Sequence, residues 1–139
     1  MGIFFHTLDV NPGLKRKTAL KRWIKDCILA ENKTPGDINI IFCSDEHLLE
    51  MNRTHLNHDY YTDIITFDFT VLDCVSGDLY ISHDRLKENS MTNKVSLENE
   101  TYRVIIHGVM HLCGYKDKTK TDIAIMRSKE EKYLDKLSF

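Results

Sequence analysis

Two histidines one helical turn apart, followed by an acidic residue, are the part of this chain best suited to chemistry. His107 and His111 are four positions apart, and five residues separate His111 from Asp117. In a helix, a spacing of four places both imidazoles on the same face. Two imidazoles and a carboxylate can share one divalent metal ion and leave coordination positions open, as catalytic sites require. We therefore predict a metal centre on His107, His111 and Asp117.

The residues around the two histidines support this interpretation. Their segment is strongly apolar, so histidines without partners would carry a desolvation cost there. Gly108 costs ~1 kcal/mol relative to Ala in a helix interior, which makes sense if another chain element packs closely beside the ligands. Zincin peptidases carry their general-base Glu at this position, so Gly108 argues against proteolysis. Satisfied core histidines remain the alternative to ligands.

The helix that positions the histidines is expected to run from Leu97 to about Cys113. Ser96 is its expected N-cap, and Gly114 is expected to end it in a left-handed conformation. Further helices are expected at Gly13–Glu31 after an Asn11 cap and Pro12, at Asp45–His55, from the Ser82 cap to about Thr92, and at Thr121–Leu137.

Strands are expected at residues 2–8, Ile38–Ser44, Asp63–Val71 and Asp78–Ser82, with turns at 34–37 and at Ser76-Gly77. This order predicts an α+β fold in which a small mixed sheet of about four strands packs with about five helices. The metal site would lie at the C-terminal end of a central helix. We expect residues 1–139 to form a single domain.

The distribution of charge is more informative than the net charge of −2. Residues 1–36 carry seven basic and three acidic residues, residues 37–100 four and thirteen, and residues 101–139 eight and five. The first helix has a basic face that is a candidate track for RNA phosphates, with a solvated helix surface as the alternative. Its basic residues are Lys15, Lys17, Lys21, Arg22 and Lys25, and its expected buried face comprises Leu20, Trp23, Ile24, Cys27 and Ile28.

Cysteine usage and hydropathy indicate the compartment. The four cysteines form no CxxC pair and lie in or beside apolar stretches, so we expect buried free thiols and a reducing cytoplasm. No window approaches the ~20 apolar residues that cross a bilayer, and the first nine residues lack the regions of a secretory signal. We expect no membrane partner.

The metal motif resembles the signature HGxxHLxGYDH of the YbeY family of bacterial rRNA-maturation endoribonucleases. This chain has His107-Gly108, His111-Leu112 and Gly114-Tyr115 at matching positions. Other segments are also similar: Thr62–Phe67 to the family's TDVLSF strand, Gly77–Ile81 to its GDI strand, and Met126 and Glu130 to a Met and a Glu in its last helix.

The resemblance implies a three-ligand zinc site at the end of a cleft and hydrolysis of single-stranded RNA. It also implies maturation of the 3′ end of 16S rRNA, work on the ribosomal small subunit, ribosome quality control and a cytoplasmic location, without a nucleotide cofactor. We expect one divalent ion, with zinc first and iron, manganese or nickel as alternatives.

Two positions depart from the family pattern. The third ligand is usually His, and Asp117 in its place lowers the charge of the site by one, which favours Fe(II) or Mn(II) more than three imidazoles would. Where the family has an Arg upstream of its TD pair, this chain has Leu56. Arg53 or Lys116 would then supply the missing positive charge. Arg53 and His55 are the predicted substrate contacts, with an exposed helix end as the alternative for both.

The expected mechanism is hydrolysis by a water bound to the ion on His107, His111 and Asp117, with the ion also polarising a phosphoryl oxygen. Asp63 either orients a ligand histidine through its other ring nitrogen or only begins its strand. Two other functions remain open. One is a non-catalytic ribosome-assembly factor that binds rRNA and holds a structural metal, and the other is a different metalloenzyme, such as another metallohydrolase or an iron oxygenase.

Overall fold

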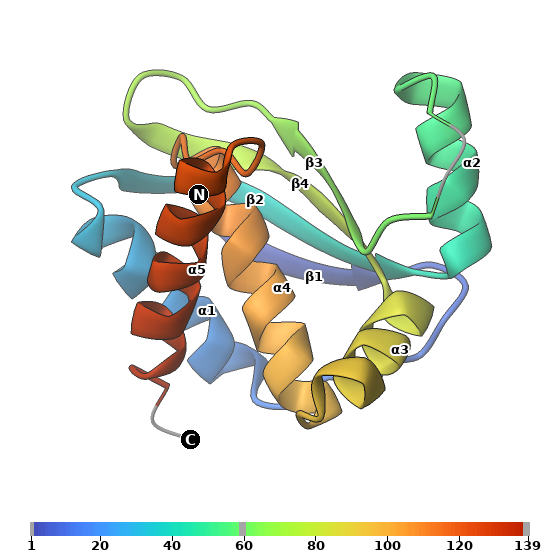
Figure 1. Ribbon diagram of the computed structural model, residues 1–139. Helices are drawn as coiled ribbons and strands as arrows, with labels where there is room; N and C mark the ends of the chain where they lie inside the picture. The colour runs from blue at the N-terminus through green and yellow to red at the C-terminus, as the bar shows by residue number, and fades with distance from the viewer. Residues whose placement is uncertain (1, 59–60, 138–139) are drawn as a thin grey trace.

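The chain folds around one mixed sheet, seen in a computed structural model that describes residues 2–58 and 61–137 (Figure 1). The strand order is β1-β2-β4-β3, with β1, β2 and β4 parallel and β3 antiparallel to β4. The predicted α+β class, with about four strands and five helices, is confirmed. In chain order the elements are β1 (Ile3–Thr7), α1 (Lys17–Ala30), β2 (Thr34–Cys43), α2 (Asp45–His55), β3 (Ile64–Asp68), β4 (Cys74–Ser82), α3 (His83–Asn93), α4 (Leu97–Leu112) and α5 (Lys120–Leu134).

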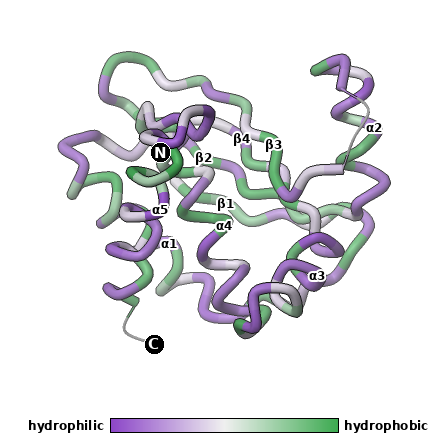
Figure 2. Tube along the Cα trace, viewed as in Figure 1, coloured by the Kyte–Doolittle hydropathy of each residue, from purple (hydrophilic) through white to green (hydrophobic). Residues whose placement is uncertain are grey.

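One face of the sheet carries the main core. α1, α4 and α5 lie together on that side (Figure 1), and their buried residues join Ile38, Ile40, Leu79 and Ile81 of the central strands in one apolar cluster. α2 covers part of the opposite face, where a smaller cluster surrounds Ile65. α3 continues from β4 and is largely hydrophilic (Figure 2). α4 is therefore held against the sheet along its apolar side, which orients its histidines.

The first helix buries the predicted face but begins later than predicted. Its buried residues are Leu20, Trp23, Ile24, Cys27 and Ile28, as expected. The Asn11 cap and the start at Gly13 were wrong. The Asn11 side chain accepts a hydrogen bond from the Gly13 amide (3.3 Å), and both Gly13 (φ 63°) and Arg16 (φ 59°) are left-handed. Because left-handed residues cannot continue a right-handed helix, α1 begins only at Lys17.

Both predicted turns in the sheet region were wrong. Thr34 and Pro35 belong to β2, and a register shift follows between Pro35 and Ile38, a place in a strand where proline is tolerated. Ser76 and Gly77 lie inside β4. The hairpin reverses instead between Val71 and Cys74, which pair as an isolated bridge, and Leu72 adopts a φ of 56°. Sequence composition placed the turn at Ser76-Gly77, whereas strand pairing placed it four residues earlier, at Leu72-Asp73.

Gly77 and Gly108 both sit where other elements approach too closely for a side chain. A Cβ on Gly77 would lie 2.4 Å from the Phe67 carbonyl oxygen. A Cβ on Gly108 would lie 2.7 Å from Ile64 Cδ1 and 3.0 Å from Leu79 Cδ1. The expectation that another element packs closely beside Gly108 is confirmed, and the strands that do so are β3 and β4.

The helix caps and the cysteines also follow the sequence. Ser44, Ser82 and Ser96 each accept a hydrogen bond from the backbone at the third residue after them, as N-caps do. All four cysteines are free thiols. Cys27, Cys43 and Cys113 are buried, and burial raises their pKa to about 12, so these thiols are protonated; Cys74 is half-buried. No helix in the described residues is long and apolar enough to span a bilayer.

Substitution of the two close-approach glycines will have unequal costs. Gly77→Ala pushes a methyl group into the backbone of β3 and should destabilise the fold by about 2–3 kcal/mol. Gly108→Ala meets only the mobile ends of two side chains and recovers ~1 kcal/mol of helix propensity, so its net cost should be smaller. Urea unfolding of both variants measures the difference, and equal losses would contradict the packing described for Gly77.

Candidate metal centre

Three side-chain atoms of the predicted ligand set converge on one point. His107 Nε2 and His111 Nε2 are 3.0 Å apart. Asp117 Oδ2 lies 3.3 Å from each of them. Among the described residues, these three form the one group of His, Cys, Asp or Glu side chains with ligand atoms close enough to share an ion. The predicted residues are thus brought together.

The end of α4 and the bend after it create this convergence. The two histidines occupy successive turns of α4, so their rings project from the same side. Gly114 takes a φ of 105° after the helix, as predicted, and the Tyr115 amide donates to the Met110 carbonyl (3.0 Å). This closure turns the chain back over the helix end. Asp117 follows two residues later and faces the histidines.

The outer nitrogens of both rings are occupied by hydrogen-bond acceptors. His107 Nδ1 donates to a carboxylate oxygen of Glu130 (2.6 Å), and His111 Nδ1 donates to the Tyr115 carbonyl (2.9 Å). A carboxylate and a carbonyl can only accept, so each Nδ1 carries the proton. In the neutral rings both Nε2 atoms then present lone pairs toward the Asp117 carboxylate. A divalent cation between these three acceptors would satisfy all of them, and a proton on one ring nitrogen would satisfy them in part.

The spacing of the three acceptors suits a tetrahedral divalent ion. Nitrogen and oxygen ligands lie about 2.0–2.1 Å from zinc, which places tetrahedral ligands roughly 3.3 Å from one another. The observed separations of 3.0, 3.3 and 3.3 Å match this edge length. The Asp117 side chain is 42% exposed, so solvent or a substrate can reach the remaining coordination position. The donor set therefore fits a catalytic type of metal site.

Glu130 is the residue that orients His107. Its side chain is 3% exposed and also accepts from Arg103 Nη1 (3.1 Å), and Arg103 in turn pairs with buried Glu100. Burial by itself would raise the pKa of the Glu130 carboxyl, but His107 and Arg103 lower it below its ordinary value. Asp63, the alternative considered from sequence, does not take this place. Its carboxylate lies 4.0 Å from Arg103, and burial raises its pKa.

A second buried carboxylate fastens the loop that carries Asp117. Glu31, just after α1, accepts hydrogen bonds from the Tyr115 hydroxyl (2.5 Å), the Lys129 ammonium (3.0 Å) and the Tyr133 hydroxyl. The Glu31 side chain is only 7% exposed. Tyr115 thus makes two contacts that matter for the site, because its carbonyl orients His111 and its hydroxyl ties the loop to α1 and α5.

The three converging atoms open into a cleft of about 590 Å³. β3 forms one wall, Asn52, Leu56 and His58 at the C-terminal end of α2 and just after it form another, and the loop before α5 completes it. Leu56, where the resemblance led us to expect an Arg, lines the cleft. The described lining residues are Asn52, Leu56, His58, Thr62, Asp63, Ile64, Ile65, Thr66, Asp68, His107, His111, Asp117 and Lys118.

The predicted substrate contacts on α2 lie outside this lining. Arg53 is half exposed, and its guanidinium lies 3.8 Å from the Glu50 carboxylate. The His55 ring packs edge-on against Phe67, with centroids 6.3 Å apart. A contact of Arg53 or His55 with substrate stays a prediction. Lys116 is exposed and also lies outside the lining, whereas Lys118 is part of it.

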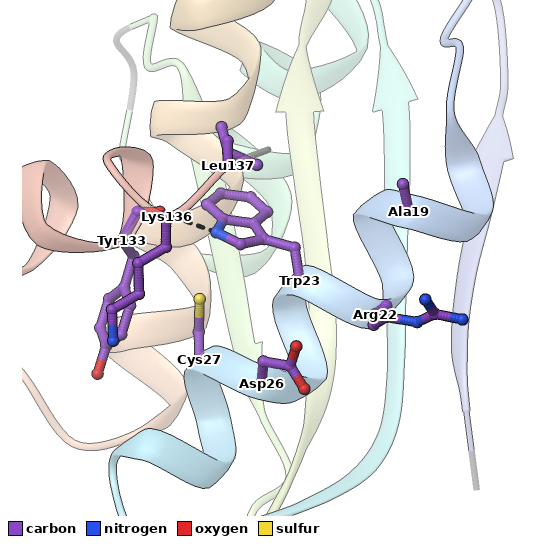
Figure 3. Close-up of a pocket in the computed structure, with 8 residues that line it drawn as sticks. All are labelled: Ala19, Arg22, Trp23, Asp26, Cys27, Tyr133, Lys136 and Leu137. Atoms are coloured by element: carbon purple, nitrogen blue, oxygen red, sulfur yellow. Dashed lines mark hydrogen bonds between the residues drawn. The ribbon is translucent and has the colours of Figure 1, made fainter. Parts of the chain in front are cut away.

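A smaller hollow of about 230 Å³ lies elsewhere, between α1 and the end of α5 (Figure 3). Trp23 lines it and donates from Nε1 to the Tyr133 carbonyl (2.9 Å). Cys27 and Lys136 also line it, but none of its residues belongs to the cleft beside the metal ligands. The hollow therefore marks the contact between the two helices and is separate from the candidate centre.

Sequence reasoning matched Glu130 to a Glu of the family's last helix but gave it no role, and it did not single out Glu31. A structural role for Glu130 could have been inferred, because it lies on the same stripe of α5 as buried Met126 and Tyr133, where an acidic residue needs a specific partner. Glu31 had no such signal. It follows the last turn of α1, and its partners are 84 to 102 residues away along the chain.

Comparisons with known proteins agree with one another. A family model described as "Endoribonuclease YbeY" matches residues 10–138. A protein of that name from Azobacteroides pseudotrichonymphae is 49% identical over 138 residues, covering 99% of both chains. Another from Flavobacterium psychrophilum is 50% identical over 126 residues, covering 91% of this chain and 90% of its own.

A solved structure shares the fold. The solution structure of TM1509 from Thermotoga maritima superposes with a TM-score of 0.69 at 24% identity and covers 97% of this chain and 88% of its own. The arrangement of elements is therefore retained where three residues in four differ.

Glu130→Gln should weaken metal binding while the protein stays folded. A neutral amide orients His107 Nδ1–H less firmly and makes its ring less basic, which should lower zinc affinity by roughly 10- to 100-fold. Competition with a chromophoric chelator measures this affinity. Glu131→Gln, an exposed neighbour on α5, is the matched control and should bind zinc as the wild type does. Equal affinities for the two variants would refute the orienting role.

Removing one hydroxyl group at a time from the tyrosines that donate to Glu31 distinguishes positioning of the loop that carries Asp117 from stability of the whole fold. Tyr115→Phe and Tyr133→Phe each delete one donor to Glu31, so both should cost roughly 1–3 kcal/mol in unfolding free energy. Only Tyr115→Phe releases the ligand loop, and its zinc affinity should fall roughly tenfold. Chelator competition and urea unfolding give the two readouts. A similar loss of zinc affinity in Tyr133→Phe would show that the hydrogen bonds to Glu31 act only through global stability.

Proposed function

This chain belongs to the YbeY family, and we propose that it is an endoribonuclease that hydrolyses phosphodiester bonds of single-stranded RNA with a metal ion held by His107, His111 and Asp117. The observation that carries the proposal is the convergence of three lone-pair donors at 3.0–3.3 Å in an open cleft. Relatives named as endoribonucleases match nearly the whole chain at 43–50% identity.

Zinc is the ion we propose, with iron, manganese and nickel as the competitors that elemental analysis can distinguish. Two imidazoles, one carboxylate and an accessible remaining position form a set that zinc hydrolases use. When bound, such an ion supplies a Lewis acid for a phosphoryl oxygen and lowers the pKa of water.

The chain's own residues prepare the site for this chemistry. Glu130 and the Tyr115 carbonyl keep the protons of His107 and His111 on Nδ1, so both Nε2 atoms stay free to bind. The buried chain from Glu130 through Arg103 holds the first ring against rotation. Gly108 places no acid or base between the ligands, which distinguishes the site from the zincin arrangement.

The biological setting is part of the proposal. We propose rRNA as the substrate, with the 3′ end of 16S rRNA and the ribosomal small subunit as the place of action, on the basis of the family membership. The free state of all four cysteines supports a reducing compartment, the cytoplasm. We also propose that residues 1–139 act as one domain, because every described helix packs on the same sheet or on its neighbours.

His111→Ala should abolish metal binding and RNA cleavage together. Removal of one of three ligands should lower the cleavage rate by at least ~10²-fold because both the Lewis acid and the activated water are lost. Elemental analysis and cleavage of structured and unstructured RNA, with and without chelator, measure both quantities. His47→Ala on exposed α2 is the control and should retain metal and activity.

Unchanged cleavage by a metal-free His111→Ala protein would defeat the mechanism. Tight binding of wild-type protein to ribosomal subunits, without any metal-dependent cleavage, would support the assembly-factor alternative instead.

A further inference from the structure

The cleft beside the metal ligands carries more acidic than basic side chains. Asp63, Asp68 and Asp117 line it, while Lys118 is the only lysine or arginine among the described lining residues. An RNA phosphate is an anion and would be repelled by carboxylates that no cation offsets. Among the described residues that line the cleft, Lys118 is therefore the one ammonium or guanidinium group that can pair with a phosphate there.

The nearest other strong cation is committed elsewhere. Arg103 lies 4.0 Å from the Asp63 carboxylate, but its guanidinium also binds Glu100 (2.5 Å) and Glu130 (3.1 Å). Its side chain is 21% exposed, and it does not line the cleft. The carboxylates balance the charge of the Arg103 guanidinium, which orients His107 through Glu130. We therefore do not assign Arg103 to the binding of a substrate phosphate.

Lys118 is anchored through its backbone although its side chain is exposed. Asp117 precedes it and belongs to the ligand group. Thr119 follows it and caps α5, where the Thr119 hydroxyl accepts from the Asp122 amide (3.0 Å) and the Thr119 amide donates to the Asp122 carboxylate (3.4 Å). The backbone of Lys118 is thus held between a candidate metal ligand and a helix cap, while its side chain is exposed.

We propose that Lys118 binds the phosphate of the RNA strand that lies beside the metal ligands. This inference rests on the proposed function and names the residue that replaces the positive charge missing at Leu56. A lysine on a flexible stem acts as a point charge that can follow a phosphate without reading bases. Its contribution should therefore be independent of RNA sequence and sensitive to salt.

The test compares Lys118→Ala, Lys118→Arg and the control Lys120→Ala, all loaded with zinc. Lys120 is exposed two residues further on and lies outside the cleft lining. Cleavage of a single-stranded oligoribonucleotide gives kcat/KM. Fluorescence anisotropy with a phosphorothioate oligonucleotide of the same sequence gives affinity as a function of salt.

Lys118→Ala should keep its zinc and lose roughly 10- to 100-fold in kcat/KM, the value of one charge-assisted contact. Its plot of log affinity against log salt should be shallower by roughly 0.7, the effect of one single-strand phosphate contact. Lys118→Arg should recover most of both losses, and Lys120→Ala should match the wild type.

The outcomes separate this inference from the proposed function. If the zinc-loaded wild type cleaves RNA and Lys118→Ala equals Lys120→Ala in rate and salt slope, the role of Lys118 is wrong and the nuclease stands. If the wild type binds but does not cleave, the nuclease is wrong, and the salt slopes still decide the role of Lys118. A wild type that neither cleaves nor binds overturns both.

Discussion

Two imidazole nitrogens and a carboxylate oxygen face one another at the end of α4, with both ring protons directed outward. When both rings are neutral, lone pairs held this close repel one another, and the surrounding structure maintains an arrangement that a bound cation would stabilise. α4 provides the spacing of the histidines, and Gly114 returns Asp117 toward them. The close contact of β3 and β4 with Gly108 keeps this end of the helix against the sheet.

Buried charges maintain that arrangement. Arg103 bridges Glu100 and Glu130, and Glu31 collects three donors behind the ligand loop. Buried ion pairs often add little net stability because both ions lose their hydration. Here Glu130 binds the ring of His107 and Glu31 binds the loop that carries Asp117, whereas Glu100 reaches the site only through Arg103. We interpret the two networks as holding the His107 ring and the Asp117 loop in position, which explains why several charged side chains are buried beside the cleft.

The scaffold and the cleft differ in how closely they follow the family. The fold persists in a solved structure at 24% identity, since many combinations of apolar residues can fill the same core. The resemblance described from sequence implies two departures in the cleft, with Asp117 as the third candidate ligand in place of a His and Leu56 in place of an Arg. The first adds a negative charge near the expected substrate and the second removes a positive one. A compensating cation is expected in such a cleft, and Lys118 is placed to provide it.

Sequence alone predicted the fold class, the three caps at Ser44, Ser82 and Ser96, the buried face of α1 and the candidate ligand set. All of these depend on interactions within a few residues or on periodicity along one element, which a linear sequence displays directly. Tertiary structure decided the rest. The hairpin reversal before Cys74, the late start of α1 at Lys17 and the partners of the histidines depend on strand pairing, backbone conformation and contacts between distant segments. Glu130 meets His107 across 23 positions and Glu31 meets Tyr115 across 84, and only the packed fold brings such pairs within hydrogen-bonding distance.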